Sequence, residues 1–411
     1  MFHYKNNRLY CENVPVETLA DKAGTPLYVY SKNKLIENLN NYQQAFGGVN
    51  HLLCYAVKAN SNAQLCKELF SRGAGADVTS GGELFRALKA GAKPEKIVFA
   101  GVGKSEDEIR YALKERIYMF NAESTEEIGL INKIAGQLKT KARLALRINP
   151  NVDAHTHKYI TTGKSENKFG IAYQKAVEVY AFAKTCNNLT VSGIHCHIGS
   201  QITSVKPFYL MAKKMAELFM KLKKTGINIE HIDIGGGLGI KYHNEVPPNP
   251  QDLAKAVLPV LKPLNTKIIL EPGRYITGNA GALVTKVIYR KAGLHKKFLI
   301  VDAGFNDLIR PALYEAYHLI LPVNKSAHSH IADVVGPICE TGDFLGKNRR
   351  LPLVKQGGLL AVMCAGAYGF AMSSQYNSRR RAAEVLVDKN NFKIVRKRET
   401  YEDLISKENS R

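Results

Sequence analysis

Short apolar runs alternate with longer amphipathic stretches between residues 50 and 275. Runs rich in β-branched and aromatic residues predict buried strands, and stretches with apolar residues every three or four positions predict helices. The strand candidates are 52–58, 75–80, 96–101, 117–122, 143–150, 189–199, 229–237 and 267–273. The helix candidates are 62–73, 81–91, 105–115, 124–138, 173–186, 204–224 and 250–262. Two of these helices, beginning near Ser105 and Ser124, open with the Ser-x-x-Glu pattern of a capping box.

Eight strand-plus-helix units in a row have the size and rhythm of an α/β TIM barrel. A doubly wound sheet is the alternative, because periodicity does not reveal whether a sheet closes. Both folds gather functional groups just beyond the carboxyl ends of their strands. We predict a barrel domain over residues 31–279.

The pattern changes after residue 280. Short β-rich runs at 281–291, 296–304, 330–339 and 351–363 follow one another with turn residues between them. This texture predicts a mostly antiparallel β domain. An early run, "LYVY" at 27–30, precedes the barrel rhythm, so both chain ends are expected to build this domain, from residues 1–30 and 280–411.

The bulk composition is that of an ordinary soluble protein, with 45% apolar and 23% charged residues in 411. No apolar stretch approaches the length of a membrane helix, and the first residues, "MFHYKNNRLYCENV", lack the apolar core of a signal peptide. Seven cysteines without framework spacing fit reduced thiols. We therefore expect a cytoplasmic protein with no membrane partner.

The net charge of +22, from 58 basic and 36 acidic residues, could attract nucleic acid or other polyanions. The basic residues are mostly dispersed, with local clusters only at 377–383 and 395–399. No basic stripe with interleaved aromatic residues, of the kind that stacks bases, is visible. We interpret the charge as a solvated surface able to attract anionic ligands, and expect no nucleic-acid partner.

Lys58 stands at the carboxyl end of the first strand candidate, in "HLLCYAVKAN" at 51–60. Such a lysine could simply extend its amine to the surface. At the rim of a barrel, a desolvated lysine is instead a candidate for a Schiff base. In that case, the neighbouring strand ends should bind an anionic aldehyde cofactor.

Two further strand ends carry candidate groups. The glycines of "DIGGGLGI" at 233–240 could present backbone N–H groups to a phosphate, or could simply form a tight turn. They lie in the wrong part of the chain for a dinucleotide fingerprint. In "LEPGRYITG" at 270–278, Glu271 could pair with its own Arg274, or could bond a pyridine nitrogen and keep it protonated.

The sixth strand end, "GIHCHIGSQ" at 193–201, places His195 and His197 on one strand face. A metal site is the first alternative, but a matching third ligand is not evident, and the nearest pair lies in "DAHTHKY" at 153–159. An imidazole stacked on a flat cofactor ring fits better, with Ser200 as a hydroxyl donor. We predict no metal.

These stretches together resemble the diaminopimelate decarboxylase family of pyridoxal-phosphate enzymes, which have an alanine-racemase-like barrel and a C-terminal β domain. Nine motifs in order carry the resemblance over nearly the whole chain: "YAVKAN", "SGGEL", "ENKFGI", "HCHIGSQ", "DIGGGLG", "EPGR", "RPALYEAYH", "CETGD" and "GAYGFAMSSQYN". Thr79, where the family often has valine, lies outside the motif residues.

The resemblance implies a cofactor site for pyridoxal 5'-phosphate. Lys58 would form the internal aldimine, His197 would stack on the cofactor ring, and Glu271 would lie opposite the pyridine nitrogen. The remaining cofactor contacts would come from Ser200, Gly236, Gly237, Gly273, Arg274 and Tyr368.

The resemblance also implies a substrate site. Arg274, Arg310 and Tyr314 would bind a substrate carboxylate. Tyr368 would contact phosphate and substrate, Glu340 would receive the distal ammonium, and Cys339 would donate a proton. In this family Cys339 and Glu340 reach the site from a second subunit, which implies a homodimer with shared active sites. Taken without the motifs, Arg310 could stabilise a turn, Tyr314 could fill a core, and Cys339 could be a small buried residue.

The implied reaction converts meso-2,6-diaminopimelate to L-lysine and CO2, the last step of lysine biosynthesis. It would pass through a quinonoid carbanion reprotonated by Cys339 or Lys58. A carboxylate at position 271 favours decarboxylation over racemisation, because it keeps the pyridine nitrogen protonated as an electron sink. The alternatives are a polyamine-pathway decarboxylase, such as one acting on ornithine or carboxynorspermidine, and a catalytically silent homologue. Arg310 argues against decarboxylases for ornithine or arginine, whose substrates lack the distal carboxylate.

Overall fold

The structure is a computed structural model that describes residues 1–153, 168–327 and 329–408. The chain forms two compact units. The barrel unit comprises Leu39–Ile240 and Val246–Tyr275, and the β unit comprises Met1–Asn38, Lys241–Glu245 and Ile276–Arg411.

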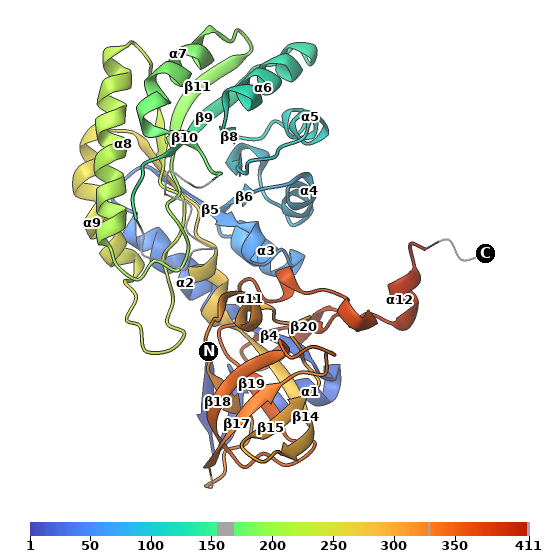
Figure 1. Cartoon of the computed structure of the whole chain (residues 1–411). Coiled ribbons are helices and arrows are strands. Elements are labelled where there is room, and N and C mark those ends of the chain that lie inside the picture. Colours follow the sequence, from blue (N-terminus) through green and yellow to red (C-terminus); the bar gives the residue numbers. More distant parts are fainter. Residues whose placement is uncertain (154–167, 328, 409–411) are drawn as a thin grey trace. The chain divides into compact units, whose positions relative to one another are not determined.

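Eight parallel strands close into a ring in the barrel unit (Figure 1). They are β5 (His51–Ala56), β6 (Gly75–Val78), β7 (Ile97–Phe99), β8 (Met119–Ala122), β9 (Ala142–Asn149), β11 (Leu189–His195), β12 (His231–Asp233) and β13 (Lys267–Leu270). The ring closes because β13 pairs with β5, and a two-residue strand β10 (Ile171–Ala172) adds to the end of β9. The predicted TIM barrel is confirmed, and the doubly wound alternative is wrong.

Helices follow the strands as the periodicity predicts. They are α3 (Ala63–Phe70), α4 (Gly81–Lys89), α5 (Glu106–Lys114), α6 (Thr125–Gln137), α7 (Ala176–Thr185), α8 (Lys206–Lys224) and α9 (Pro250–Leu261). Two more helices, α2 (Lys32–Ala45) and α10 (Arg274–Thr277), bracket this series. Each buries the apolar face that its 3.6-residue period predicts, as α4 does with Leu84 and Ala87.

One of the two predicted capping boxes forms completely. Ser105 accepts from the N–H of Glu108, whose carboxylate accepts from the N–H of Ser105 in return. Ser124 also accepts from the N–H of Glu127. The carboxylate of Glu127, however, bonds the N–H of Glu123 and the amine of Lys104, so the reciprocal half of this box is absent. The two oxygens of this carboxylate are therefore taken by Lys104 and by the N–H of Glu123 in place of the N–H of Ser124.

The barrel interior changes from apolar to polar along its strands. Residues from several strands form one apolar cluster: Leu52, Cys54, Val98, Met119, Ala145 and Ile269. Side chains two positions apart on a strand share a face. Two positions beyond Met119, Ala145 and Ile269 are the buried Asn121, Arg147 and Glu271. The strand period therefore carries an apolar layer directly into a polar rim at the carboxyl ends.

The β unit contains a second sheet built by both ends of the chain (Figure 1). Its strands are β4 (Leu27–Ser31), β14 (Gly281–Ala292), β15 (Lys297–Val301), β16 (Ile320–Pro322), β17 (Ser329–Val335), β18 (Phe344–Pro352), β19 (Leu359–Val362), β20 (Ala383–Asp388) and β21 (Asn391–Arg396). Most pairs are antiparallel, but β15–β17 and β4–β20 are parallel. The mostly antiparallel domain with an N-terminal strand is confirmed.

The sequence analysis missed several elements of the β unit. A small sheet of β1 (Phe2–Lys5), β2 (Arg8–Cys11) and β3 (Val14–Pro15) precedes helix α1 (Val16–Ala23). Strands β20 and β21 and the short helices α11 (Arg310–Tyr314) and α12 (Tyr401–Ile405) were also not predicted. All three N-terminal strands are at most four residues long, too short for a period to register.

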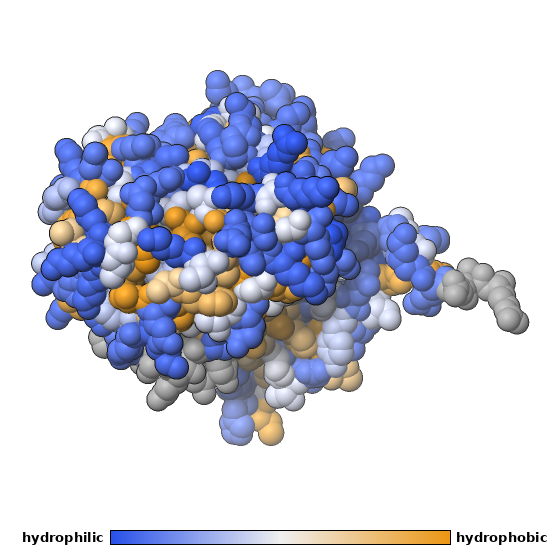
Figure 2. All heavy atoms as spheres, turned by 90° about the horizontal axis from the view of Figure 1, so that it is seen from above, coloured by the Kyte–Doolittle hydropathy of each residue, from blue (hydrophilic) through white to orange (hydrophobic). Residues whose placement is uncertain are grey.

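The hydrophilic character of the surface agrees with the amino-acid composition. Figure 2 shows a face on which hydrophilic residues dominate, with smaller hydrophobic areas between them. Within the described ranges, no helix has the length and apolarity needed to cross a membrane. All seven cysteines lie in the described part of the chain and are free thiols, as the absence of framework spacing predicts.

Lys104, in the loop between β7 and α5, is a buried cation of the barrel unit. Its side chain has 0% exposure, and its Nζ donates to the carbonyls of Gly101 and Asn121 at 2.8 Å and to Glu127 Oε1 at 2.6 Å. These acceptors satisfy all three ammonium protons. Lys104 therefore ties the loop after β7 to the end of β8 and the start of α6.

We expect Lys104→Met to destabilise the protein by about 3 to 5 kcal/mol, because it leaves the carboxylate of Glu127 buried without its cation. The shift of the thermal unfolding midpoint measures this effect. Lys114→Met removes an exposed lysine from the end of α5 and is the matched control. Equal midpoints for the two variants would show that the pair contributes nothing.

Candidate active site

Lys58 lies just beyond the first barrel strand. Strand β5 ends at Ala56, and Lys58 follows in a 3₁₀ turn, Val57–Ala59, rather than in the predicted strand itself. Its side chain is 36% exposed, and its Nζ donates to Asp77 Oδ2 at 2.8 Å. Asp77 is fully buried at the end of β6. The amine is therefore held at the rim and does not simply extend into solvent.

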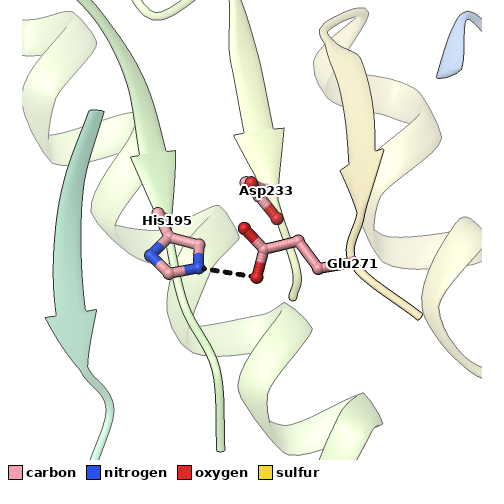
Figure 3. A group of neighbouring side chains, drawn as sticks. All are labelled: His195, Asp233 and Glu271. Atoms are coloured by element: carbon pink, nitrogen blue, oxygen red, sulfur yellow. Dashed lines mark hydrogen bonds and ion pairs between the residues drawn. The ribbon is translucent and has the colours of Figure 1, made fainter. Parts of the chain in front are cut away.

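Glu271, the first residue after β13, bonds to two side chains from other strand ends. Its Oε2 accepts from His195 Nε2 at 3.3 Å, and its Oε1 accepts from Asn121 Nδ2 at 3.2 Å. Asp233, at the end of β12, points at the same carboxylate (Figure 3). Asp233 Oδ1 accepts from the N–H of Gly235 at 2.9 Å. The register of β11 and β12 places His195 beside Asp233.

The three buried carboxyl groups at this rim do not share one protonation state. Burial, and then the charge of Glu271, raises the pKa of Asp77 to about 7 against the opposing effect of Lys58. Burial, and then Glu271, raises the pKa of Asp233 well above its usual range. Burial would raise the pKa of Glu271 as well, but His195 and Lys58 outweigh it and lower that pKa. Of the three, Glu271 is therefore the carboxyl group that ionises most readily, and Asp233 beside it holds a proton more readily than an ordinary aspartic acid.

His197 follows β11 and meets the glycine loop after β12. The N–H of Gly236 donates to His197 Nδ1 at 3.2 Å, which leaves the proton of the neutral ring on Nε2. Burial, and then the charges of Arg147 and Lys58, lower the pKa of His197 well below its usual value. The ring is therefore an uncharged imidazole.

The glycine loop needs glycine for close backbone approach. A Cβ on Gly236 would lie 2.2 Å from the carbonyl oxygen of Glu271, and Gly237 has φ +109° with a Cβ position 2.4 Å from the carbonyl oxygen of Gly199. Glu271 also donates its N–H to the carbonyl of Gly235 at 2.8 Å. The loop is thus fixed against the neighbouring strand ends, which accounts for part of the glycine run without any ligand.

Ser200 and Arg274 are brought together. Arg274 begins α10, is buried, and donates from Nη2 to Ser200 Oγ at 3.0 Å. A Cβ on the preceding residue, Gly273, would lie 3.0 Å from the methyl carbons of Ala56 and Ala59. The predicted residues of the barrel unit therefore converge on the carboxyl ends of β5, β11, β12 and β13.

The remaining predicted residues belong to the β unit. Arg310 begins α11 and is buried, with its guanidinium 4.6 Å from the ring centre of Tyr242 and Nη1 2.8 Å from His318 Nε2. Tyr314 ends the same helix and is half-buried. Tyr368, also half-buried, has a left-handed backbone with φ +56°, in the loop after β19.

Cys339 and Glu340 are exposed in the loop between β17 and β18. The N–H of Cys339 donates to Asn377 Oδ1 at 3.1 Å, and Glu340 accepts from the hydroxyl of Tyr376. The alternative interpretation of Cys339 as a small buried residue is therefore wrong. An exposed thiol and carboxylate on one loop are accessible to a second molecule.

The sequence analysis missed the strand-end residues Asp77, Asn121, Arg147 and Asp233. Arg147 pairs with Glu123 at 2.8 Å, and both side chains are buried. The available signal was a polar residue within the last three positions of a largely apolar barrel strand.

His195, Asp233 and Glu271 offer ligand atoms within 4.8 Å of one another, a set that could hold a cation. The hydrogen bond between His195 and Glu271, and the one that Asp233 accepts from the N–H of Gly235, account for the positions of these side chains without a cation. The histidines at 155 and 157, and the first two residues of "ENKFGI", lie outside the described residues.

Comparison with known proteins gives the family. The model of the "Pyridoxal-dependent decarboxylase, pyridoxal binding domain" matches residues 32–278. A diaminopimelate decarboxylase of Aquifex aeolicus is 52% identical over 404 residues, which cover 98% of this chain and 96% of that protein.

Solved structures agree. Diaminopimelate decarboxylase from Helicobacter pylori, complexed with L-lysine, has a TM-score of 0.92 at 43% identity and covers 95% of this chain and 98% of its own. Diaminopimelate decarboxylase from M. jannaschii, in co-complex with L-lysine, has a TM-score of 0.96 at 38% identity and covers 100% of this chain and 98% of its own. This chain therefore belongs to the pyridoxal-dependent decarboxylases, and within them to the diaminopimelate decarboxylase family.

Proposed function

We propose that this chain decarboxylates meso-2,6-diaminopimelate to L-lysine and CO2, with pyridoxal 5'-phosphate attached to Lys58. The observation that carries the proposal is the position of the Lys58 amine, bonded to Asp77 at a barrel rim that also holds an ionised Glu271. The relatives named for this reaction match nearly the full length of the chain.

The side chains at the rim fit this cofactor. Lys58 supplies the amine for covalent attachment, and the neutral ring of His197 supplies a flat face for stacking. The glycine loop at 235–237 and the Ser200–Arg274 pair provide N–H and O–H donors suited to a phosphate. We assign Gly236, Gly237, Gly273 and Tyr368 to the same site, and residues 31–279 as the cofactor-binding domain.

When bound, pyridoxal phosphate accepts the electrons of the bond to the departing carboxylate. The task of Glu271 is to keep a proton on the pyridine nitrogen, for which it must stay ionised. His195 donates a hydrogen bond to Glu271. Asp233, whose pKa is raised well above its usual range, keeps its proton and so places no second negative charge beside Glu271. We therefore assign His195 and Asp233 as positioning residues for Glu271.

Substrate selection rests on charge. Arg274, Arg310 and Tyr314 bind the carboxylate groups of the substrate, and Glu340 accepts its distal ammonium. A guanidinium binds a carboxylate through two parallel hydrogen bonds, which a substrate without the distal carboxylate cannot offer. Cys339 Sγ or Lys58 Nζ delivers the proton to the product carbon. We propose that Cys339 and Glu340 act from a partner subunit, in a cytoplasmic homodimer.

Replacing Lys58 by alanine should abolish the visible absorbance of the loaded protein and lower kcat for lysine release by about a thousandfold or more. Borohydride reduction followed by peptide mapping should place the pyridoxyl label on Lys58. Lys67→Ala, which removes an exposed lysine from α3, is the control. A label on another lysine would refute the assignment, and release of putrescine from ornithine in place of lysine would refute the substrate.

Arg310→Ala should lower kcat/KM for diaminopimelate by about 10- to 100-fold, because a charged hydrogen bond contributes about 1.5 to 3 kcal/mol. Cofactor absorbance should stay unchanged. Arg310→Lys keeps the charge but not the paired geometry, so it should recover only part of the loss. Steady-state kinetics identical to those of the unmodified enzyme would contradict the role.

Asp233→Ala should lower kcat by about 10- to 100-fold through loss of support for Glu271. Asp233→Asn should retain most activity, because its amide can donate to Glu271 and accept from Gly235. The pH dependence of the cofactor absorbance should shift in the alanine variant and not in the asparagine variant. Equal activity losses in the two variants would show that Asp233 does not act as a neutral donor.

A further inference from the structure

The two basic clusters of the sequence, 377–383 and 395–399, meet at one cavity of the β unit. The cavity has a volume of about 380 Å³, and its lining includes Arg379, Arg380 and Arg398. Segments from five parts of the chain form its walls, from Thr25 near the N-terminus to Tyr401 on α12. The decarboxylation chemistry uses none of these arginines.

Each of the three guanidinium groups is held by a neutral partner. Arg379 donates to the carbonyl of Asp302 at 3.3 Å, and Arg398 donates to the carbonyl of Pro26 at 2.6 Å. The guanidinium of Arg380 lies 4.6 Å from the ring centre of Tyr401. These contacts fix the side chains without neutralising their charge.

The lining holds two carboxyl groups, Asp302 and Asp307, against three guanidinium groups, so it keeps an excess of positive charge. No carboxylate oxygen of the described residues lies within 4.0 Å of a guanidinium nitrogen of the three arginines. Asp302 uses both of its oxygens on other donors, Thr25 Oγ1 at 2.5 Å and Thr285 Oγ1 at 2.7 Å. Burial raises the pKa of Asp307 to about 7, so it carries only part of a charge near neutrality.

The cations also act on one another. Burial lowers the pKa of Arg398, and the charge of Arg380 lowers it further. Like charges gathered in one half-buried cavity repel, and an anion placed between them would relieve that repulsion. The planar guanidinium presents paired N–H donors that match the oxygens of a phosphate group.

We propose that the cavity lined by Arg379, Arg380 and Arg398 binds a small oxyanion of the phosphate class, either free phosphate or a phosphate monoester. Ser378 in its lining adds a hydroxyl group, and the cavity is large enough for one phosphate group and a short organic substituent. The site is separate from the residues assigned to the cofactor, so phosphate binding there can be tested independently of catalytic turnover.

The test titrates the full-length protein, loaded with pyridoxal phosphate so that the phosphate site of the cofactor is filled. Inorganic phosphate and glycerol 3-phosphate are added in separate series at constant ionic strength, and calorimetry with the thermal midpoint reports binding. We expect saturable binding of at least one probe. Binding of the ester alone would assign the site to a phosphorylated metabolite, and binding of both to the phosphate group itself.

Arg380→Gln should weaken binding by about tenfold or more, because it removes a charged donor. This variant should fold normally, since Arg380 contributes a stacking contact and no hydrogen bond to the described structure. Lys397→Gln, an exposed neighbour of Arg398 with the same change in charge, should leave binding within about twofold.

Three outcomes would overturn the proposal. They are no saturable binding of either probe, equal weakening in Arg380→Gln and Lys397→Gln, and a change of oligomeric state in Arg380→Gln without phosphate binding in the parent protein. The last result, read by analytical ultracentrifugation, would assign the cavity to a subunit contact.

Discussion

At the rim of the barrel, three buried carboxyl groups have too few cationic neighbours for all three to be ionised. An ionised carboxylate loses several kcal/mol of solvation on burial unless cations and donors replace the water. Asp77, Asp233 and Glu271 face one lysine and one histidine at hydrogen-bond distance. His195 and Lys58 lower the pKa of Glu271, which stays ionised, and the other two carboxyl groups, whose pKa values are raised, take up protons more readily. The distribution of protons at the rim follows from this competition.

The barrel fixes which groups compete. Three side chains of the rim, Asn121, Arg147 and Glu271, stand two positions beyond the apolar cluster along their chain segments, so the packing below them sets their direction. His195 and Asp233 are direct neighbours across the pair β11–β12. A register slip of one residue would turn His195 or Asp233 to the outside of the barrel. Apolar packing and the chemistry of the rim are therefore specified by the same strand pairing.

The strands and helices of the barrel were predictable from local sequence patterns, because strands and helices each have a characteristic period of hydrophobic residues. The pairing of β13 with β5, which closes the ring, joins distant segments and has no local signal, so closure could only be inferred from the number of units. Lys58, His197 and Glu271 were predictable as polar residues directly after strands. Asp77 and Asn121 were not, because a single polar residue within a short strand is equally typical of an exposed strand face. Glu127 shows a second limit, since the pattern of a capping box does not reveal that Lys104 takes its carboxylate.

The same competition explains what the net charge of +22 means. Most of that charge is spread over the surface, and arginines such as Arg143 and Arg396 are paired with carboxylates. The composition alone therefore overstates the attraction for polyanions. A cationic side chain indicates an anionic ligand where carbonyl groups or aromatic rings position it and no carboxylate pairs with it. Among the described residues, Arg379, Arg380 and Arg398 meet this condition. At the rim, the cations are too few to balance three ionised carboxylates, so some of the carboxyl groups keep their protons. At the arginine cavity, two carboxyl groups meet three guanidinium groups that cannot lose a proton, and the anion proposed for this cavity would supply the remaining negative charge.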